Sequence, residues 1–386
     1  MGGTFDPVHS GHIIMAKEAA RAASLDRVLM IPTGNPPHKK GITPAEHRWR
    51  MVCAAAAQEP LLEPCRMEVD RVGVIYTVDT LSELHGIYPD ADLFYMIGSD
   101  TLMELKHWRR YEDVLKLCTF LVCPRTVKVD QAALDDECAR LEALGGSFIH
   151  VDMEPVDVSS TELRQALASG EETELLPLVC REYARLAGLY GLEPRLSEDR
   201  LAWLERLFNT LSRKRFAHTL GVTEYAARLA KIHGLDEEKT LIAALLHDCA
   251  KCMPEEDMRA VCTEQGLTDD PDILQSGNLM HALVGAYVAE REYGVTDREV
   301  LDAIRRHTMG EPGMTEIDMA VNLADKIELT RAPYPHLNEV REAAQHSLPD
   351  ALRLSLEGTE SYVADRGEKL HPMTADTLAW LKAAAH

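Results

Sequence analysis

The chain has 386 residues, 46% of them hydrophobic and 27% charged, which is enough for two or three domains that each bury a core. Its formal net charge of -22 argues against a general affinity for nucleic acid or for an anionic membrane, because binding either of these needs a basic surface. Neither an apolar run of about 18 residues nor a signal-peptide pattern is present, so we expect a cytoplasmic protein without a membrane span.

The first twelve residues, Met-Gly-Gly-Thr-Phe-Asp-Pro-Val-His-Ser-Gly-His, predict a phosphate site. Gly2 and Gly3 lack a Cβ atom and allow the backbone to approach a ligand closely. His9 and His12 are three residues apart and precede an apolar run, so we expect them to share one face at the start of a helix. A helix N-terminus presents unpaired N–H groups and the positive end of the dipole, and both stabilise an anion.

Helical and strand patterns then alternate up to about residue 190. This alternation predicts a parallel sheet with right-handed crossovers, in which ligands collect at the carboxyl ends of the strands. We expect helices up to Ala23, over 44–58 and over 176–186, and strands over 28–31, 93–98 and 120–123; the loop with Lys39, the pair Ser99-Asp100 and the pair Pro124-Arg125 each follow a strand.

A second anion-binding pattern lies in the segment 156–166. Either Ser159 or Ser160 caps a helix whose first turn contains Thr161 and whose next turn contains Arg164. Backbone N–H groups, hydroxyls and a guanidinium would then converge on one anion. A short polar junction over 193–197 separates this part of the chain from the rest.

These motifs resemble those of one enzyme family. Residues 1–12 are similar to the GGTFDPxHxGH signature of the nucleotidylyltransferase superfamily, and specifically of nicotinate-nucleotide adenylyltransferases. The Pro-Pro-His-Lys string, Tyr76-Thr77, the block from Gly98 to Trp108 and the Ser-Ser-Thr string before Arg164 follow in the same order. The resemblance implies transfer of AMP from ATP, with Mg²⁺ on the triphosphate, to nicotinate mononucleotide. Nicotinamide mononucleotide remains a competing substrate, and a pantetheine-phosphate or cytidylyl substrate a remoter one.

The family's residue roles carry over to matching positions of this sequence. The resemblance implies that catalysis at the phosphates involves His9, His12, Lys39 and Arg164; that ATP contacts Gly2, Gly3, Thr4, Phe5, Asp100, Ser160 and Thr161; and that nicotinate mononucleotide contacts Tyr76, Thr77, Trp108 and Arg125. From the sequence alone, Tyr76 and Thr77 would be a strand end and a helix N-cap.

Strand patterns are absent beyond residue 198, where five predicted helices carry or adjoin histidine and aspartate. His218 lies within one helix, His247-Asp248 and His307 end two others, His281 begins a fourth, and Asp325 lies within 317–329. One histidine on an apolar face is usually a core residue. Imidazole and carboxylate together, however, suit a transition metal or magnesium, and two metals can bridge a phosphate and activate water.

The order of these residues resembles the H…HD…D pattern of HD-domain phosphohydrolases, in the group that cuts diadenosine tetraphosphate symmetrically into two ADP. The resemblance implies a site for two metal ions, Fe, Mn or Mg, in which His281 and His307 hold the second ion. It also implies that Lys251 contacts phosphate. Another nucleotide phosphohydrolase, a guanosine-polyphosphate hydrolase and a nucleotide-sensing module without turnover remain open. The nine cysteines indicate reduced thiols, and Cys249-x-x-Cys252 lacks the second pair of a zinc ribbon.

We therefore expect an α/β Rossmann-like nucleotidylyltransferase domain over 1–192, followed by an all-α HD domain over 198–386. The partners of the whole chain would be ATP, nicotinate mononucleotide and a dinucleoside polyphosphate. We expect no nucleic acid or membrane among the partners, and a homo-oligomer is compatible with the sequence. Only Met1 precedes the glycine pair, whereas the resemblance implies a strand there. We expect the natural start to lie a few residues upstream; the alternative is a transferase impaired by the missing strand.

Overall fold

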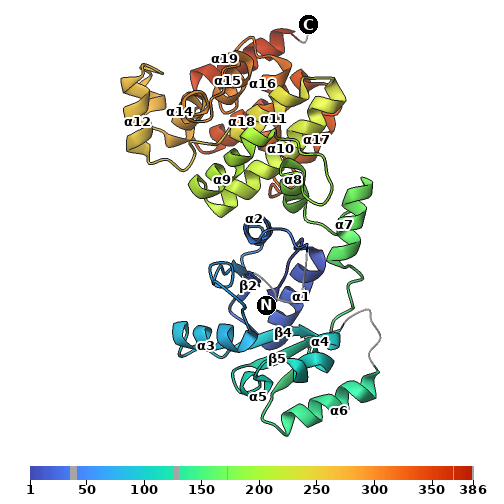
Figure 1. The fold of residues 1–386 in the computed structure, drawn as a ribbon. Helices are drawn as coiled ribbons and strands as arrows, with labels where there is room; N and C mark the ends of the chain where they lie inside the picture. Colours follow the sequence, from blue (N-terminus) through green and yellow to red (C-terminus); the bar gives the residue numbers. More distant parts are fainter. Residues whose placement is uncertain (35–40, 125–129, 172, 368, 385–386) are drawn as a thin grey trace. The chain divides into compact units, whose positions relative to one another are not determined.

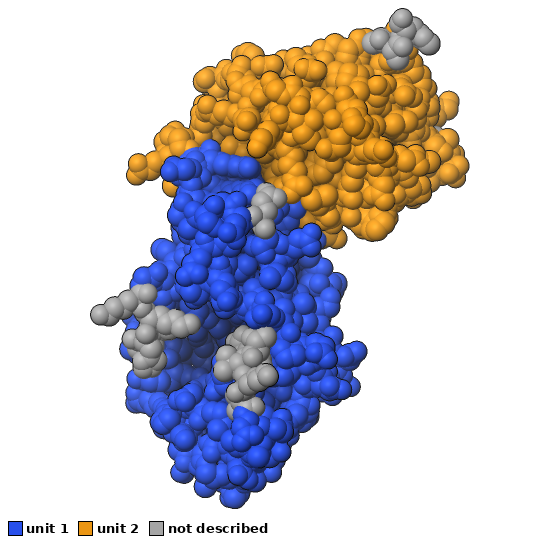
Figure 2. Space-filling view, turned by 90° about the vertical axis from the view of Figure 1, so that its right-hand side faces the viewer, with its two compact units in different colours: residues 1–196 blue, residues 197–386 orange. Residues whose placement is uncertain are grey.

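The computed structural model describes residues 1–34, 41–124, 130–171, 173–367 and 369–384. The chain divides into two compact units, Met1–Leu196 and Ser197–His386 (Figure 2). Among the described residues, no helix has both the length and the hydropathy that crossing a bilayer requires.

The first unit alternates parallel strands with helices, as the sequence predicts (Figure 1). Hydrogen bonding joins the strands into two parallel three-stranded sheets, in the orders β1-β2-β3 and β4-β5-β6. The elements are β1 Gly2–Gly3, α1 Ser10–Ala23, β2 Val28–Pro32, α2 Ala45–Ala56, β3 Leu62–Pro64, α3 Thr77–Ile87, β4 Phe94–Gly98, α4 Ser99–Glu104, the 3₁₀ helix Leu105–His107, α5 Tyr111–Val114, β5 Thr119–Cys123, α6 Gln131–Glu142, β6 Phe148–His150, α7 Ser160–Ser169 and α8 Leu178–Leu186.

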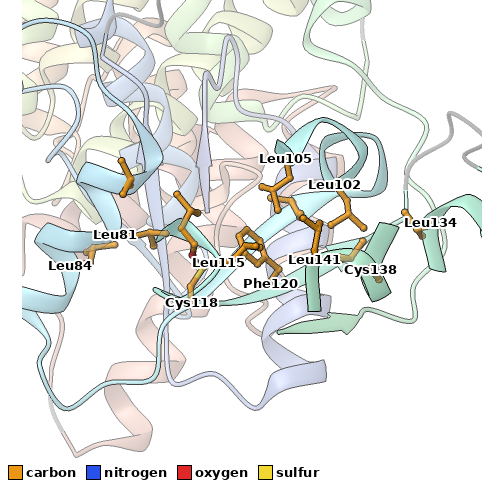
Figure 3. Close-up of a cluster of buried hydrophobic side chains, with 14 of the residues drawn as sticks. Leu81, Leu84, Leu102, Leu105, Leu115, Cys118, Phe120, Leu134, Cys138 and Leu141 are labelled. Carbon is orange, nitrogen blue, oxygen red and sulfur yellow. Dashed lines mark hydrogen bonds between the residues drawn. The ribbon is translucent and has the colours of Figure 1, made fainter. Parts of the chain in front are cut away.

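A hydrophobic core fixes β4, β5 and the helices around them. Phe120 of β5 is fully buried and packs in one cluster with Leu102 of α4 and Leu141 of α6 (Figure 3). Leu105 and Leu115 extend the same cluster. Burying side chains of this size stabilises the fold by roughly 1.5–3 kcal/mol each. The cluster thereby fixes the carboxyl end of β4, from which Ser99 and Asp100 follow.

The first strand is only two residues long. The amino group of Met1 donates to the Leu29 carbonyl at 2.9 Å, and a Cβ atom on Gly2 would lie 2.8 Å from the Tyr95 hydroxyl of β4. A cavity of about 690 Å³ is lined by residues of β2 and β4, among them Leu29 and Tyr95, and by Met1 and Leu93. The expectation of strand residues upstream of Met1 stays a prediction.

The described part of the second unit consists of helices and their connections, in agreement with the all-α expectation. After the 3₁₀ turn Glu198–Arg200, the helices are α9 Leu201–Thr210, α10 Arg213–His233, α11 Glu237–Leu246, α12 Glu255–Glu264, α13 Pro271–Leu274, α14 Gly277–Glu292, α15 Arg298–Arg306, α16 Glu316–Ile327, α17 Leu337–Ala343, α18 Leu348–Asp365 and α19 Pro372–Ala384.

Two local expectations about this unit and one about the first were wrong. His281 lies inside α14, because that helix already begins at Gly277. Residues 247–252 form turns instead of continuing the helix before them. In the first unit, Tyr76 does not end a strand: it occupies the N-cap position of α3, and Thr77 is the first helical residue.

Candidate active sites

The loop after β1 fixes which nitrogen of His12 carries a proton. The backbone N–H of His9 donates to Nδ1 of His12 at 3.2 Å. Nδ1 must therefore hold a lone pair, so the proton of the neutral imidazole is on Nε2. The two imidazole rings stack with centroids 3.7 Å apart, and Phe5 packs edge-on against His12. His12 thus presents an N–H donor at the start of α1, which suits a phosphate oxygen.

The start of α7 lies against this loop, although about 150 residues separate the two in sequence. Ser160 Oγ donates to the Pro7 carbonyl at 3.1 Å, and the Arg164 guanidinium donates to the Asp6 carbonyl at 2.7 Å. A second nitrogen of Arg164 donates to Thr161 Oγ1 at 3.2 Å. The structure therefore brings both predicted anion-binding patterns together.

Two local features position α7. Ser159, not Ser160, caps the helix: its hydroxyl accepts from the backbone N–H of Glu162, whose carboxylate accepts from the backbone N–H of Ser159. The segment before α7 also approaches α1 closely, since a Cβ on Gly11 would lie 2.7 Å from a methyl of Val158. A larger residue at Gly11 would push the two anion-binding elements apart.

Arg48 is a positioning residue whose role the sequence did not reveal. It is 1% exposed and donates to the carbonyls of Thr4, Gly34 and Thr43 at 2.7 to 2.8 Å. Burial lowers the pKa of its guanidinium. Three charge-assisted hydrogen bonds satisfy the buried cation and tie the glycine loop to the chain on both sides of 35–40. In the sequence Arg48 was one of several charged residues of a predicted helix.

Tyr76 and Trp108, two of the residues predicted to hold the nicotinate half, pack with Tyr95 against the same hydrophobic cluster. The Tyr95 ring packs edge-on against Trp108 with centroids 5.9 Å apart. The Arg109 guanidinium lies 4.5 Å from the centre of the Tyr76 ring, and the sequence interpretation missed this cation. An aromatic wall with a cation beside it suits an aromatic acid.

Three further predicted residues complete the account of the first unit. Asp100 lies in the first turn of α4, where its carboxylate accepts from the Thr101 backbone N–H at 2.9 Å. Lys39 and Arg125 lie outside the described residues.

In the second unit, five segments bring the predicted metal ligands into one buried cluster. Two overlapping groups have ligand atoms that all lie within 4.8 Å of one another: His218, His247 and Asp325 form one, and His247, Asp248 and His307 form the other. His281 adjoins the second group, with its Nε2 3.2 Å from Asp248 Oδ1 and 3.0 Å from His307 Nε2. All six predicted ligands are therefore neighbours.

Three of the histidines have Nδ1 beside an acceptor. His247 and His307 donate from Nδ1 to the carbonyls three residues earlier, each at 2.7 Å. Nδ1 of His218 donates to the Glu328 carboxylate at 3.2 Å. In each neutral ring the lone pair is then on Nε2, which points toward the carboxylates, and this is the tautomer that a metal requires.

His247 provides a test of whether a cation fits. Its side chain is fully buried, and its Nε2 has no hydrogen-bond partner within the described parts of the chain. That atom lies 3.3 Å from Asp248 Oδ2 and 3.8 Å from Asp325 Oδ1. A buried lone pair facing two carboxylates is costly unless a positive charge joins them. A divalent cation would satisfy all three groups.

The protonation of the cluster favours the same conclusion. Burial alone would raise the pKa of Asp248, but the surrounding histidines outweigh it and hold that pKa well below its ordinary value. Burial, with repulsion from the neighbouring histidines, lowers the pKa of His307 to about 3. At neutral pH the carboxylate is therefore ionised and His307 is neutral, as metal ligands must be.

Lys251 and Glu328 support the cluster from outside. Lys251 Nζ lies 3.2 Å from His281 Nδ1 and 3.1 Å from Asn278 Oδ1, and burial lowers its pKa. Glu328 is 1% exposed and orients His218, a role that the sequence analysis did not predict. Cys249 is buried with its thiol on the Gly285 carbonyl.

Comparisons with known proteins match both halves of the chain. The cytidylyltransferase-like family model matches residues 1–166, and the HD domain model matches residues 215–330. A probable nicotinate-nucleotide adenylyltransferase of Thermoanaerobacter sp. is 35% identical over 195 residues, which cover 49% of this chain and 92% of that protein.

One relative matches along almost the whole length. A probable nicotinate-nucleotide adenylyltransferase/Ap4A hydrolase of Mycoplasma genitalium is 26% identical over 371 residues, covering 94% of this chain and 98% of that protein. A solved structure described as a predicted HD superfamily hydrolase involved in NAD metabolism, from Clostridium acetobutylicum, is 36% identical, covers 49% of this chain and 98% of its own, and superposes with a TM-score of 0.47.

Proposed function

Because the chain belongs to the nicotinate-nucleotide adenylyltransferase family, we propose that residues 1–192 transfer AMP from ATP to nicotinate mononucleotide. The 5′-phosphate of the mononucleotide forms a bond to the α-phosphorus of ATP, and the bond between that phosphorus and the α–β bridging oxygen breaks. The products are deamido-NAD and pyrophosphate. Mg²⁺ on the triphosphate would neutralise charge as pyrophosphate leaves.

The observation that carries this assignment is the convergence of His12, Ser160 and Arg164 on the loop after β1. Positioning and charge stabilisation account for catalysis of this type, since no covalent enzyme intermediate is needed. The His12 Nε2–H would donate to phosphate oxygens whose charge grows in the transition state. Thr77, Trp108 and the Tyr76 ring would hold the pyridine acid, with Asp100, Lys39 and Arg125 completing the nucleotide contacts.

The test is the variant His12→Ala assayed for pyrophosphate release. Loss of one preorganised donor to a transition state lowers kcat by about 10²–10³-fold. We expect KM for ATP to rise much less, because the interaction strengthens only as charge develops. An unchanged kcat would refute the role of His12. Competition between nicotinate and nicotinamide mononucleotide in the same assay tests the acceptor.

For residues 198–386 we propose metal-dependent hydrolysis of a dinucleoside polyphosphate, with diadenosine tetraphosphate giving two ADP. The unpartnered, buried Nε2 of His247 between two carboxylates is the observation that carries this proposal. The six ligands would hold two divalent ions, Fe, Mn or Mg, which would supply Lewis acidity and an activated water. The relative that spans both halves favours this substrate over another HD activity or a sensing module.

The full-length protein tests this proposal in hydrolysis assays with added Mn²⁺, Fe²⁺ or Mg²⁺. A panel of nucleotides that includes guanosine polyphosphates separates the alternatives. We expect Asp248→Ala to abolish hydrolysis and to reduce the bound metal, while the transferase activity persists. Full hydrolysis with equal metal stoichiometry in that variant would contradict the assignment.

A further inference from the structure

Two arginines engage the same carboxylates that are proposed to bind metal. A terminal nitrogen of Arg215, in the first turn of α10, lies 2.7 Å from Asp248 Oδ2. A terminal nitrogen of Arg331, in the segment after α16, lies 2.9 Å from Asp325 Oδ1, and its Nε donates to the Asp325 carbonyl at 2.8 Å. The side chains of Asp248 and Asp325 are 2% and 20% exposed, whereas those of Arg215 and Arg331 are 29% and 37% exposed. Each arginine therefore lies on the solvent side of a ligand.

A guanidinium and a divalent cation compete for one carboxylate oxygen. Both need the same lone pairs, and two positive centres on one oxygen repel each other strongly where water is scarce. Arg331 also donates to the Asp325 carbonyl from Nε and from a terminal nitrogen, so its planar guanidinium must turn as one unit at the rim of the cluster to leave the Asp325 carboxylate. Arg215 is held at the start of α10, whose N-cap is Ser212.

A polyphosphate substrate needs cations at this rim. The chain carries a formal net charge of -22, so its overall field repels a polyanion, and local positive groups must compensate. The planar fork of a guanidinium fits a phosphate as well as it fits a carboxylate. Lys251, the phosphate contact implied by the sequence, is a single point charge and cannot span a phosphate chain alone.

We propose that Arg215 and Arg331 bind the phosphate chain of the substrate, exchanging the carboxylates of Asp248 and Asp325 for phosphate when divalent cations occupy the cluster. This inference rests on the hydrolase function proposed above and names the groups that would recognise its substrate class. The two arginines thus act twice: they neutralise the ligands before the metals bind, and they select polyphosphates afterwards.

The test uses Arg215→Gln and Arg331→Gln in the full-length chain, with Arg353→Gln as the control. Arg353 is 28% exposed and pairs with Glu357 at 3.0 Å, so it matches Arg215 in exposure and in having an acidic partner while being absent from the cluster's contacts. Calorimetry measures the affinity for Mn²⁺ alone, and then the affinity of the Mn²⁺-loaded protein for inorganic tripolyphosphate. Phosphate binding elsewhere on the chain is common to the control and the two variants. The difference between each variant and the control therefore reports tripolyphosphate binding at the cluster.

We expect Arg215→Gln and Arg331→Gln each to bind Mn²⁺ as tightly as the wild type or several-fold more tightly, because the guanidinium that competes for the carboxylate is gone. Tripolyphosphate affinity should fall about tenfold for each arginine removed, in line with the loss of a charge-assisted hydrogen bond. Arg331→Lys keeps the charge without the fork, so we expect a smaller loss. In the hydrolysis assay KM for diadenosine tetraphosphate should rise more than kcat falls.

Two results would overturn the inference. A tenfold loss of Mn²⁺ affinity in the glutamine variants would show that the arginines only hold the carboxylates in place. Tripolyphosphate affinity equal to that of Arg353→Gln would show that they do not meet phosphate. A wild type that hydrolyses no dinucleoside polyphosphate would instead refute the proposed function, and the two binding measurements would still decide the role of the arginines.

Discussion

The substitution Gly221→Ala should weaken the metal site without touching a ligand. Gly221 lies three residues after His218 on α10, so both face the same neighbours. A Cβ atom at this position would lie 2.5 Å from Glu328 Oε2, closer than real Cβ atoms approach any heavy atom. The carboxylate that accepts the His218 Nδ1–H at 3.2 Å would have to move.

The size of the effect follows from what the displaced carboxylate does. The side chain of Glu328 can shift, so the helix survives; alanine also gains about 1 kcal/mol of helix propensity over glycine. His218 loses the acceptor that fixes its Nε2 lone pair, and disturbing such an outer partner costs about 10–100-fold in metal affinity or activity. We therefore expect little change in thermal stability together with a loss of that size in Mn²⁺ affinity.

The assay is calorimetric Mn²⁺ titration beside a thermal melt, and the chain offers a matched control. Gly358 also lies inside a long helix, α18, and a Cβ there would meet no atom within 4 Å. Gly358→Ala should raise stability and leave Mn²⁺ affinity as it is. Glu328→Gln, which leaves the backbone alone, should lose affinity as Gly221→Ala does. The reasoning is refuted if Gly221→Ala binds Mn²⁺ as tightly as the control.

Three further predictions concern the first unit, and each is checked by chemical denaturation of the full chain. Burial raises the pKa of the Glu68 carboxyl, so its contribution to stability is present below its ordinary pKa of 4.5 and is lost as pH rises through the raised value. Glu68→Gln should therefore stabilise the protein at pH 7 but not at pH 4. An equal gain in stability at both pH values would contradict this. Ser159→Ala removes the cap of α7 and should cost about 1 kcal/mol, and an unaltered denaturation midpoint would exclude that role. Because Arg164 moves with the helix, the same variant should also raise KM for ATP in the pyrophosphate-release assay. Arg48→Lys cannot reproduce three forked hydrogen bonds and should cost about 3 kcal/mol or more, whereas a loss below 1 kcal/mol would mean that the loop is held in other ways.

The sequence predicts the first unit well where the signal is periodic and local. Apolar runs place β2, β4 and β5 within one residue at each end, and the Ser-Ser-Thr string places the start of α7. β3 and β6 escaped prediction, because each has only three residues and pairs with a strand distant in sequence. The stacking of Arg109 on Tyr76 was equally invisible, since it depends on how two loops meet.

For the second unit the sequence predicts the proposed metal ligands but not the residues that position them. His247-Asp248 stands out as an adjacent pair, and the other four ligands follow from the order of the motif. Glu328 acts through a contact 110 residues away from His218, and the arginines lie among many surface arginines of similar sequence context. Such roles depend on tertiary distances, which neither periodicity nor composition encodes.

Histidine would be a hydrogen-bond donor at one proposed site and a metal ligand at the other, and a backbone contact of Nδ1 determines which. At His12 a backbone N–H donates to Nδ1, so the proton is on Nε2, from which it would donate to a phosphate oxygen. At His247 and His307 a backbone carbonyl accepts from Nδ1, so Nε2 keeps a lone pair for a metal. The imidazole is the same in both places, and a single main-chain contact at Nδ1 determines whether Nε2 carries the proton or the lone pair. For His12, His247 and His307, the backbone partner of Nδ1 therefore determines whether Nε2 donates a proton or offers a lone pair.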